Sequence, residues 1–519
     1  HLTMNPSFMS TPQHRFLMGS SFFSGLLLMS TCLLAEDAPQ WGQRHTRNMV
    51  SNEVDLPNEF DPKTGSNVKW SVPLGTRTYS SPVVAQGKVL IGTNNGRPRD
   101  SRHKGDRGVL MCFAEETGEF LWQLIVPKLE EELSYKDWPD VGIVSPATVD
   151  ANRVYLMDNR GTVLCLDVDG QYNGNDGPFI NEGQSMVPPG DAPIKVIPRD
   201  GDIIWKYDLE AELGVHQHDS AHCSILVHGP FLYICTSNGV DATHRRIIAP
   251  EAPSLIVLDK KTGRLVARDR EPIGPRIVHC TWSSPSVAEV DDRSLIFFGA
   301  GNGICYAFEA LPPSVVGAAP PKTLKKVWWF DGDPSAPKDN VHQYQGNRRI
   351  SPSNIYGMPV VHQDRVFVIF GGDYWHGKRK AWIKCINPSG KGNITESAAQ
   401  WSYPILNHCM TTPAVQNGLV FVADCGRTLH CIDAKTGRAY WTHDTEGISW
   451  ASPLVADGKI HLGTQRGDFW VMEANKEKKI ISRINLHEPI NGTPTAANGM
   501  LFVATSGHLY ALKTSAFKP

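Results

Sequence analysis

The pattern of hydrophobic and polar positions is clearest in residues 411–445, where four short apolar runs alternate with turn signals. Asn417-Gly418 is a two-residue turn of the kind that joins antiparallel strands, because both residues tolerate a positive φ. Short apolar runs separated by such turns predict an antiparallel β-meander. The four predicted strands are Pro413–Val415, Leu419–Ala423, Thr428–Ile432 and Ala439–Thr442.

Copies of this unit recur along most of the chain. One meander cannot bury both of its faces, so the copies are expected to pack against one another. The last copy has only three strands, and residues 61–74 supply one strand with nothing before it. Pairing that strand with the last copy closes a ring and removes the open sheet edges. The copies are residues 80–124, 144–209, 222–269, 283–333, 357–405, 411–445, 451–486 and 492–513.

The predicted fold is therefore all-β, an eight-bladed β-propeller of four-stranded antiparallel blades that spans residues 61–513. Its last blade is shared between residues 61–74 and 492–513. Residues 36–60 form a polar lead-in that is expected to pack on the ring without joining a blade, and residues 514–519 form a tail.

The first 35 residues have the pattern of a signal peptide. A short basic start at His14-Arg15 is followed by the apolar stretch Phe16–Leu34 and a small residue, Ala35, as cleavage point. This predicts a periplasmic or secreted protein with no membrane span after cleavage. The alternatives are a buried helix in the same place and a lipid anchor on Cys32.

Charge and motifs exclude several classes of function. The 519-residue chain has 51 Lys and Arg and 53 Asp and Glu, a net charge of −2, so neither a nucleic acid nor an anionic membrane surface is expected as a partner. The chain lacks a Cys-Cys pair and a CxxC motif, and no nucleophile-elbow, zincin, P-loop or Rossmann pattern lies in a fitting context. We expect a monomer.

Polar and aromatic side chains gather just before the first strands of several blades. Because the first strand of a propeller blade is innermost, the loops that lead into it surround the central channel, and converging polar groups there predict a binding site. The alternatives are local strand-end capping by each histidine and metal binding by histidine and cysteine. The candidates are His216, His218, Asp219, His222, His279, Trp282, Arg348, Arg349, Asp373, His408 and Trp450.

A second candidate lies in the insertion of the second blade. Oxygen-bearing side chains alternate there with glycines, a pattern that suits a Ca²⁺ loop, although the spacing differs from an EF-hand. The alternative is a plain Asx/Gly loop. The candidate ligands are Asp167, Asp169, Asn173, Asn175 and Asp176.

The repeat, with Cys-Ile-Asp433-Ala-Lys-Thr-Gly437 followed by Trp441, resembles the pyrroloquinoline quinone (PQQ)-type propeller repeat with its tryptophan-docking motif. This resemblance implies that each such Trp caps the outer strand and stacks on the turn of the next blade. Trp70, Trp122, Trp205, Trp401 and Trp441 fit the motif, whereas Ala267 and Ile480 or Ile481 depart from it.

Several groups share this repeat. The chain resembles PQQ-like propeller proteins of planctomycete-type bacteria in Gln40-Trp41-Gly42, 213–218, 237–241, 252–263 and 282–285. It also resembles quinoprotein alcohol dehydrogenases, but it lacks their vicinal Cys pair, and their Ca²⁺ ligands and catalytic Asp find no match. The lipoprotein that assists outer-membrane barrel assembly is similar in fold and serves as a non-catalytic scaffold.

Two functions follow as expectations. The first is an exported propeller that binds an envelope protein or a small-molecule ligand at the channel mouth. The alternative is a PQQ-dependent dehydrogenase of alcohols or sugars, which would use PQQ and Ca²⁺. In that case Trp282 or Trp450 would stack on the quinone, Asp219 or Asp373 would act as base, and Arg348 or Arg349 would polarise the quinone oxygens.

Overall fold

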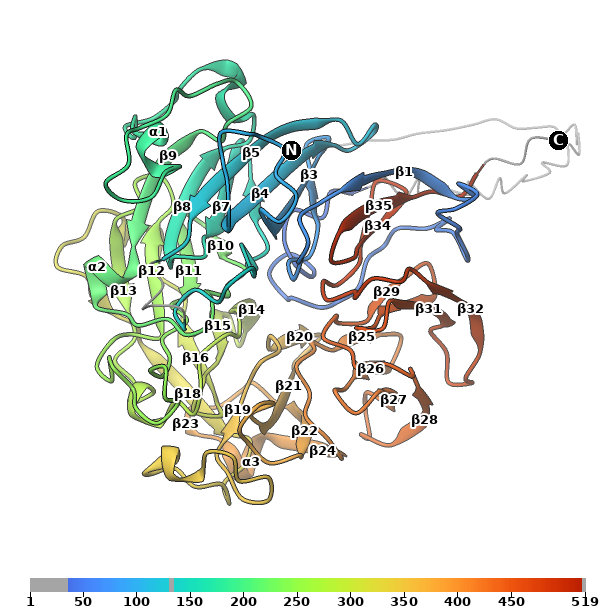
Figure 1. Ribbon diagram of the computed structural model, residues 1–519. Helices are drawn as coiled ribbons and strands as arrows, with labels where there is room; N and C mark the ends of the chain where they lie inside the picture. Colours follow the sequence, from blue (N-terminus) through green and yellow to red (C-terminus); the bar gives the residue numbers. More distant parts are fainter. Residues whose placement is uncertain (1–35, 130–134, 516–519) are drawn as a thin grey trace, which may run out of the picture. The chain divides into compact units, whose positions relative to one another are not determined.

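The computed structural model describes residues 36–129 and 135–515. These residues form eight sheets that are arranged as a ring. The predicted signal peptide, Cys32 and the tail residues 516–519 lie outside the described residues. The sheets follow one another around the ring in chain order, and β1 at the blue end of the chain lies beside β35 at the red end (Figure 1). The predicted eight-bladed β-propeller is confirmed.

The strands of the first four blades are β2 (Val83–Ala85), β3 (Lys88–Asn94), β4 (Arg107–Ala114) and β5 (Phe120–Pro127); β6 (Thr148–Asp150), β7 (Arg153–Met157), β8 (Thr162–Asp167) and β9 (Ile203–Asp208); β10 (Leu226–His228), β11 (Phe231–Cys235), β12 (Leu255–Asp259) and β13 (Leu265–Arg268); and β14 (Ser286–Val290), β15 (Arg293–Gly299), β16 (Ile304–Glu309) and β18 (Lys326–Asp331). Two short strands, β17 (Lys322–Thr323) and β23 (Gly392–Asn393), add parallel to the outer edges of the third and fourth blades.

The strands of the other blades are β19 (Ser353–Asn354), β20 (Val360–His362), β21 (Arg365–Gly372), β22 (Ala381–Ile386) and β24 (Ala399–Ile405); β25 (Ala414–Gln416), β26 (Leu419–Ala423), β27 (Thr428–Asp433) and β28 (Ala439–Asp444); β29 (Leu454–Ala456), β30 (Lys459–Gly463), β31 (Asp468–Glu473) and β32 (Ile480–Asn485); and β33 (Thr495–Ala497), β34 (Met500–Ala504), β35 (His508–Leu512) and β1 (Val68–Pro73). The helices are short: α1 (Glu182–Ser185), α2 (Leu209–Leu213), α3 (Thr395–Ala398), and the 3₁₀ turns η2 (Gly170–Asn173), η3 (Gly274–Arg276), η4 (Pro313–Val315) and η5 (Val341–Tyr344).

The N-terminal strand closes the ring as predicted. β1 pairs antiparallel with β35, which pairs with β34, and β34 pairs with β33. The innermost strands contact one another around the channel, β2 touching both β6 and β33. Closure removes the exposed edges that an open stack of blades would leave. The short first strands therefore line a central channel.

Tryptophans of the outer strands join neighbouring blades. Each indole N–H donates to a backbone carbonyl in the turn of the next blade, as Trp441 Nε1 does to Asn475 O at 2.9 Å. In the third strand a small residue faces each Trp, such as Cys431 opposite Trp441 and Ala307 opposite Trp328. Trp328 adds a sixth docking residue to the five that were predicted. The donors are Trp70, Trp122, Trp205, Trp328, Trp401 and Trp441.

A substitution at Gly437 tests the contact between Trp401 and the turn of the next blade. Gly437 has φ +73°, and a Cβ built there would lie 2.6 Å from the ring of Trp401. Gly418 of the same blade has φ +75° but nothing within 4 Å of such a Cβ. Gly437→Ala is expected to lower the free energy of unfolding by about 1–3 kcal/mol more than Gly418→Ala, because both add strain at positive φ but only the first overpacks this contact. Urea unfolding measures the difference, and equal losses would refute the clash.

The lead-in forms a strap across the channel, defined here as residues 36–51. Its backbone accepts hydrogen bonds from the inner strands of successive blades, including those from Val149 N to Pro39 O at 2.7 Å and from Val455 N to Met49 O at 2.9 Å. Arg47 is fully buried and donates to the carbonyls of Trp41, Pro285 and Ser224 and to the Ser224 hydroxyl. The strap therefore ties the blades together from inside the channel.

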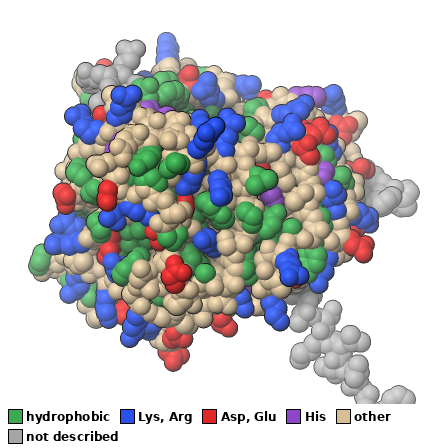
Figure 2. All heavy atoms as spheres, turned by 90° about the horizontal axis from the view of Figure 1, so that it is seen from below, with side chains coloured by type: hydrophobic (Ala, Val, Ile, Leu, Met, Phe, Trp, Pro, Cys, Tyr) green, Lys and Arg blue, Asp and Glu red, His purple; other side chains and the backbone are tan. Residues whose placement is uncertain are grey.

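The outer surface carries mixed charge. The face in Figure 2 shows Lys and Arg interspersed with Asp and Glu, with hydrophobic side chains between them. None of the helices in residues 36–129 and 135–515 has the length and apolar character needed to cross a membrane.

Candidate functional site

A cavity of about 530 Å³ lies in the channel, between the strap and the loops at the mouth. Trp41 of the strap forms part of its lining, and its indole N–H donates to Thr493 Oγ1 at 3.0 Å. The other lining residues come from the loops that enter the first strands and from the loops that join second and third strands. The strap thus bounds the cavity at one end, and the cavity opens between the loops at the other.

Eight Trp and Tyr side chains contribute to the wall of the cavity. Trp282 stacks on Tyr356 with ring centroids 5.7 Å apart and an interplanar angle of 22°, and its N–H donates to Ser220 O. Trp375 meets Trp282 edge to face at 5.8 Å. The aromatic lining residues are Trp41, Tyr79, Tyr135, Trp138, Trp282, Tyr356, Trp375 and Trp450.

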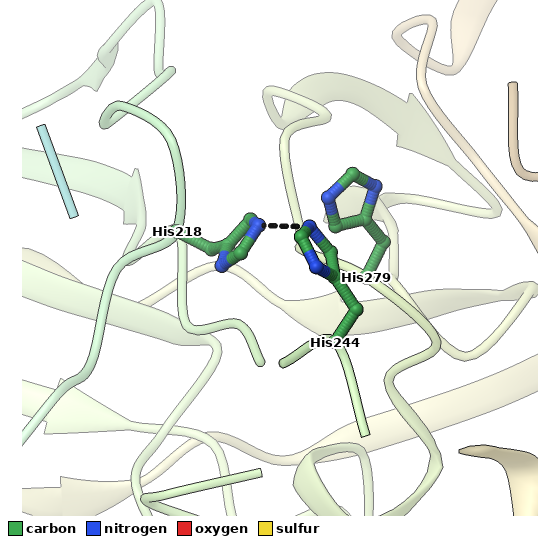
Figure 3. Close-up of side chains that lie close together, drawn as sticks. All are labelled: His218, His244 and His279. Carbon is green, nitrogen blue, oxygen red and sulfur yellow. Dashed lines mark hydrogen bonds between the residues drawn. The ribbon is translucent and has the colours of Figure 1, made fainter. Parts of the chain in front are cut away.

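Three histidines converge at one side of the cavity. One ring nitrogen from each of His218, His244 and His279 lies within 4.8 Å of the others, and the Nε2 atoms of His218 and His244 are 2.9 Å apart (Figure 3). His218 precedes β10, His279 precedes β14, and His244 lies in the loop from β11 to β12. Antiparallel order brings all three loops to the same face.

The tautomers of two of these histidines follow from their partners. His218 Nδ1 lies 2.9 Å from Val240 O, and a carbonyl only accepts, so Nδ1 carries the proton and Nε2 is left with a lone pair in the neutral ring. His279 Nδ1 lies 3.0 Å from Asp373 Oδ2 and donates in the same way. His279 Nε2 is buried and has no hydrogen-bond partner among the described residues.

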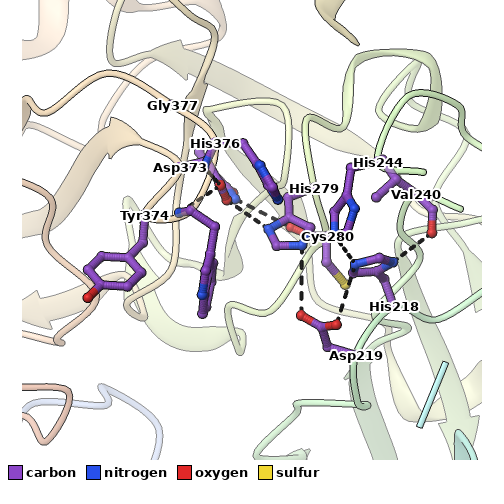
Figure 4. Close-up of polar contacts among 12 residues, drawn as sticks. His218, Asp219, Val240, His244, His279, Cys280, Asp373, Tyr374, His376 and Gly377 are labelled. Carbon is purple, nitrogen blue, oxygen red and sulfur yellow. Dashed lines mark hydrogen bonds and ion pairs between the residues drawn. The ribbon is translucent and has the colours of Figure 1, made fainter. Parts of the chain in front are cut away.

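Asp373 fixes both His279 and the loop that follows β21 (Figure 4). Its Oδ2 also accepts from Tyr356 Oη, and its Oδ1 accepts from the backbone N–H groups of Trp375 at 3.1 Å and His376 at 2.7 Å. Burial alone would raise the pKa of Asp373, but His279 and these donors outweigh it, and the pKa lies well below its usual value. Asp373 is therefore an ionised anchor with no free acceptor position.

Asp219 lies between two of the histidines. Its carboxylate oxygens are 3.5 Å from His218 Nε2 and 3.8 Å from His279 Nε2. Burial raises the pKa of Asp219 to about 6, against the opposing pull of His279. Burial lowers the pKa of His218 to about 2 and that of His244 to about 4. Burial also acts to lower the pKa of His279, but the Asp373 charge outweighs it and the pKa is raised.

The structure brings together some of the predicted residues and separates others. Asp219, His222, His279, Trp282 and Trp450 line the cavity, and His218 and Asp373 lie directly behind it. Among the predicted residues outside the lining, His216 uses its backbone N–H to bond Asn238, and His408 Nε2 faces Gly377 O at 3.4 Å.

Arg348 does not face the cavity. Its guanidinium donates to the backbone carbonyls of Tyr374, Trp375 and Gly377, so it supports the loop that carries Trp375. Arg349 is exposed and is not part of the lining. The structure thus places neither arginine in the lining, and their contact with a ligand in the channel stays a prediction.

The predicted Ca²⁺ loop spreads its oxygens among separate partners. Asp167 binds Arg153, and Asp169 lies 2.9 Å from Lys88 Nζ. Asn175 donates to Glu182, and Asn173 donates to Asp176. The Ca²⁺ loop and the plain Asx/Gly loop therefore both stay predictions for this segment.

The sequence reasoning missed several lining residues, namely Tyr79, Tyr135, Trp138, His244, Tyr356, Trp375 and His376. A signal was present for two of them, because Tyr374-Trp375-His376 follows Asp373 directly after a buried strand. His244 lies in a loop from a second to a third strand, and such loops reach the same face as the loops that were considered.

The ring and its repeats define an eight-bladed β-propeller, and comparison with known proteins finds similarity to a barrel-assembly factor and to quinoprotein dehydrogenases. The family model described as "Outer membrane protein assembly factor BamB" matches residues 379–479. A 1-butanol dehydrogenase (cytochrome c) of Thauera butanivorans is 23% identical over 155 residues, which cover 26% of this chain and 22% of that protein. The chain thus matches about a fifth of the length of this curated relative.

Solved structures share the fold at low identity. BamB from Moraxella catarrhalis has a TM-score of 0.52 and 13% identity, covering 87% of this chain and 97% of that one. A europium-containing methanol dehydrogenase has a TM-score of 0.58 and 12% identity, covering 92% and 98%.

Proposed function

We propose that the protein is an exported binding protein whose ligand site is the aromatic cavity at the channel mouth. The observation that carries the proposal is the lining itself. It has eight aromatic side chains and one carboxylate, Asp219, and the described lining residues include no Lys or Arg. The predicted signal peptide and the similarity to an outer-membrane assembly factor support a place in the cell envelope.

This lining favours a small, planar, uncharged ligand. Aromatic walls stack on flat rings, and the cavity volume falls in the range of small-molecule pockets. An anion would lie near Asp219 with no Lys or Arg in the described lining to pair with it. The ligand class therefore follows from the combination of Trp faces with the absence of Lys and Arg from the described lining.

PQQ with Ca²⁺ does not fit these residues. PQQ is an anionic quinone, and both arginines that were expected to meet it lie outside the lining. Ca²⁺ takes six to eight oxygen ligands, whereas the site offers mainly imidazoles, and Asp373 has its oxygens occupied. The quinoprotein dehydrogenase is therefore not the function we propose.

A scaffold that binds an envelope protein is the second candidate. The match of residues 379–479 to an assembly-factor model favours it, and these residues run from the fifth blade to the seventh. Such a partner would bind the outer face of the blades and would not depend on the lining of the cavity.

The ligand proposal is tested with 2-naphthol, a neutral bicyclic aromatic, added to the purified protein. We expect quenched tryptophan fluorescence and a raised melting temperature, because a ligand that binds only the native state stabilises it. Trp375→Ala is expected to weaken binding about tenfold, the equivalent of about 1.4 kcal/mol for one lost aromatic contact. The control, Tyr172→Ala, removes an exposed aromatic outside the lining.

Two results would contradict the proposal. Equal affinity of the Trp375 variant and the wild type would move the ligand out of the cavity. A rise in melting temperature with PQQ and Ca²⁺ and none with 2-naphthol would favour the dehydrogenase instead.

A further inference from the structure

We propose that His218, His244 and His279 bind a divalent first-row transition metal at the edge of the cavity. The proposal rests on their converging ring nitrogens and on His279 Nε2, which is buried and has no hydrogen-bond partner among the described residues. The inference goes beyond the proposed binding function and does not depend on any organic ligand.

The outer contacts of these histidines are those of a metal site. A ligating histidine commonly donates its other N–H to a carbonyl or a carboxylate, which fixes the ring and leaves the second nitrogen free for the metal. His218 does this with Val240 O, and His279 does it with Asp373 Oδ2. Two buried rings are thus held with their lone pairs turned to a common point. His244, held in a left-handed backbone conformation at φ 58°, supplies the third nitrogen. Without metal, its Nε2 donates a hydrogen bond to His218 Nε2 at 2.9 Å, so metal binding requires that proton to move to Nδ1 of His244.

The donor set selects the class of metal. Imidazole nitrogens suit Zn²⁺, Cu²⁺, Ni²⁺ and Co²⁺, whereas Ca²⁺ and lanthanides prefer oxygen ligands. Three histidines leave a fourth position, and the Asp219 carboxylate lies beside it, 3.5 Å from His218 Nε2 and 3.8 Å from His279 Nε2. A substrate, a water or this carboxylate would complete the set, as in catalytic rather than closed structural zinc sites. His244, His279 and Asp219 line the cavity, so the fourth position faces the space where a ligand would lie.

Two other clusters are weaker candidates. His279, Asp373 and His376 lie close together, but the Asp373 oxygens are already used and His279 has only one free nitrogen. Asp100, His103 and Asp200 also approach one another, but Arg102 makes 2.6 Å ion pairs with both carboxylates. A guanidinium thus already neutralises that group.

The test uses the purified full chain, stripped with a chelator and titrated with Zn²⁺, Co²⁺ and Ca²⁺ by calorimetry. We expect one Zn²⁺ per chain, strong visible absorption with Co²⁺ in a four-coordinate site, and no Ca²⁺ binding at this position. His244→Asn is the diagnostic variant, because Asn tolerates the left-handed conformation and His244 is only partly buried, so the fold is retained.

His244→Asn is expected to weaken Zn²⁺ binding by more than the roughly 10- to 100-fold that loss of an outer-shell partner costs. His443→Ala is the matched control, because His443 lies on β28 outside the lining. We expect the His443→Ala protein to bind Zn²⁺ as the wild type does. The proposal is overturned if the wild type binds no Zn²⁺, or if His244→Asn binds it with unchanged affinity and stoichiometry.

Discussion

Arg47→Met is expected to lower the free energy of unfolding by about 3–5 kcal/mol, because removing one partner from a buried polar group leaves the others unsatisfied. Three carbonyls and one hydroxyl accept hydrogen bonds from this guanidinium. Methionine keeps most of the volume but donates nothing. Burial lowers the pKa of Arg47 to about 10, so the side chain is still charged at neutral pH, and four of its five N–H groups donate hydrogen bonds.

Arg44 offers a control within the same strap. Its guanidinium is about half exposed and pairs with Asp150 at 2.9 Å. Exposed ion pairs contribute about 0–1 kcal/mol, so Arg44→Ala is expected to be nearly neutral. Arg47→Lys should fall between the two, since a lysine keeps the charge but cannot reach the carbonyls with a planar fork. Denaturant unfolding of the three variants gives the ranking, and an Arg47→Met loss no larger than that of Arg44→Ala would contradict it.

Arg47 also affects the shape of the cavity. Arg47 donates to Trp41 O, and Trp41 is part of the cavity lining. Arg47→Met removes this hydrogen bond within the strap, and we therefore expect it to weaken 2-naphthol binding as well. Stability of the ring and shape of the site are coupled through this one segment.

The blades were predictable because their pattern is local and repeated. Each first turn, such as Asn417-Gly418 with φ 51° and 75°, fixes a two-residue hairpin, and β26 begins and ends where its apolar run does. Ring closure followed from the three-stranded last copy. Trp328 was missed as a docking residue because it adjoins Trp329, and only the strand register, with Ala307 opposite Trp328, shows which of the two faces the next blade.

The site was less predictable because it depends on contacts between blades. Loops into first strands were identified correctly as mouth loops, which placed His218 and His279. His244 is 26 residues from His218 and lies in a loop of a different class, although antiparallel geometry brings both to one face. Arg348 belongs to a segment that the sequence places at the channel mouth, but its guanidinium donates to the backbone carbonyls of Tyr374 and Trp375. The residue type alone does not show whether an arginine faces a ligand or the backbone.

Asp373→Asn is expected to weaken Zn²⁺ binding at the histidine cluster while leaving the fold in place. Asn Oδ1 can still accept the N–H groups of Trp375 and His376 that Asp373 Oδ1 accepts now. The amide nitrogen then takes the place of Oδ2 beside His279 Nδ1 and must donate to it. His279 consequently shifts to the tautomer with the proton on Nε2, and a protonated Nε2 cannot ligate a metal.

The expected results are a loss of stability of about 2 kcal/mol, in the range for hydrogen bonds to a charged group, and a Zn²⁺ affinity reduced at least about 10- to 100-fold. Asp364→Asn makes the same charge change in the exposed turn between β20 and β21 and should bind Zn²⁺ normally. The imidazole nitrogen signals in the NMR spectrum report the tautomer directly. A folded Asp373→Asn variant with wild-type affinity for Zn²⁺ would show that Asp373 does not orient a metal ligand, whereas loss of affinity together with the tautomer change would separate this role from a purely structural one.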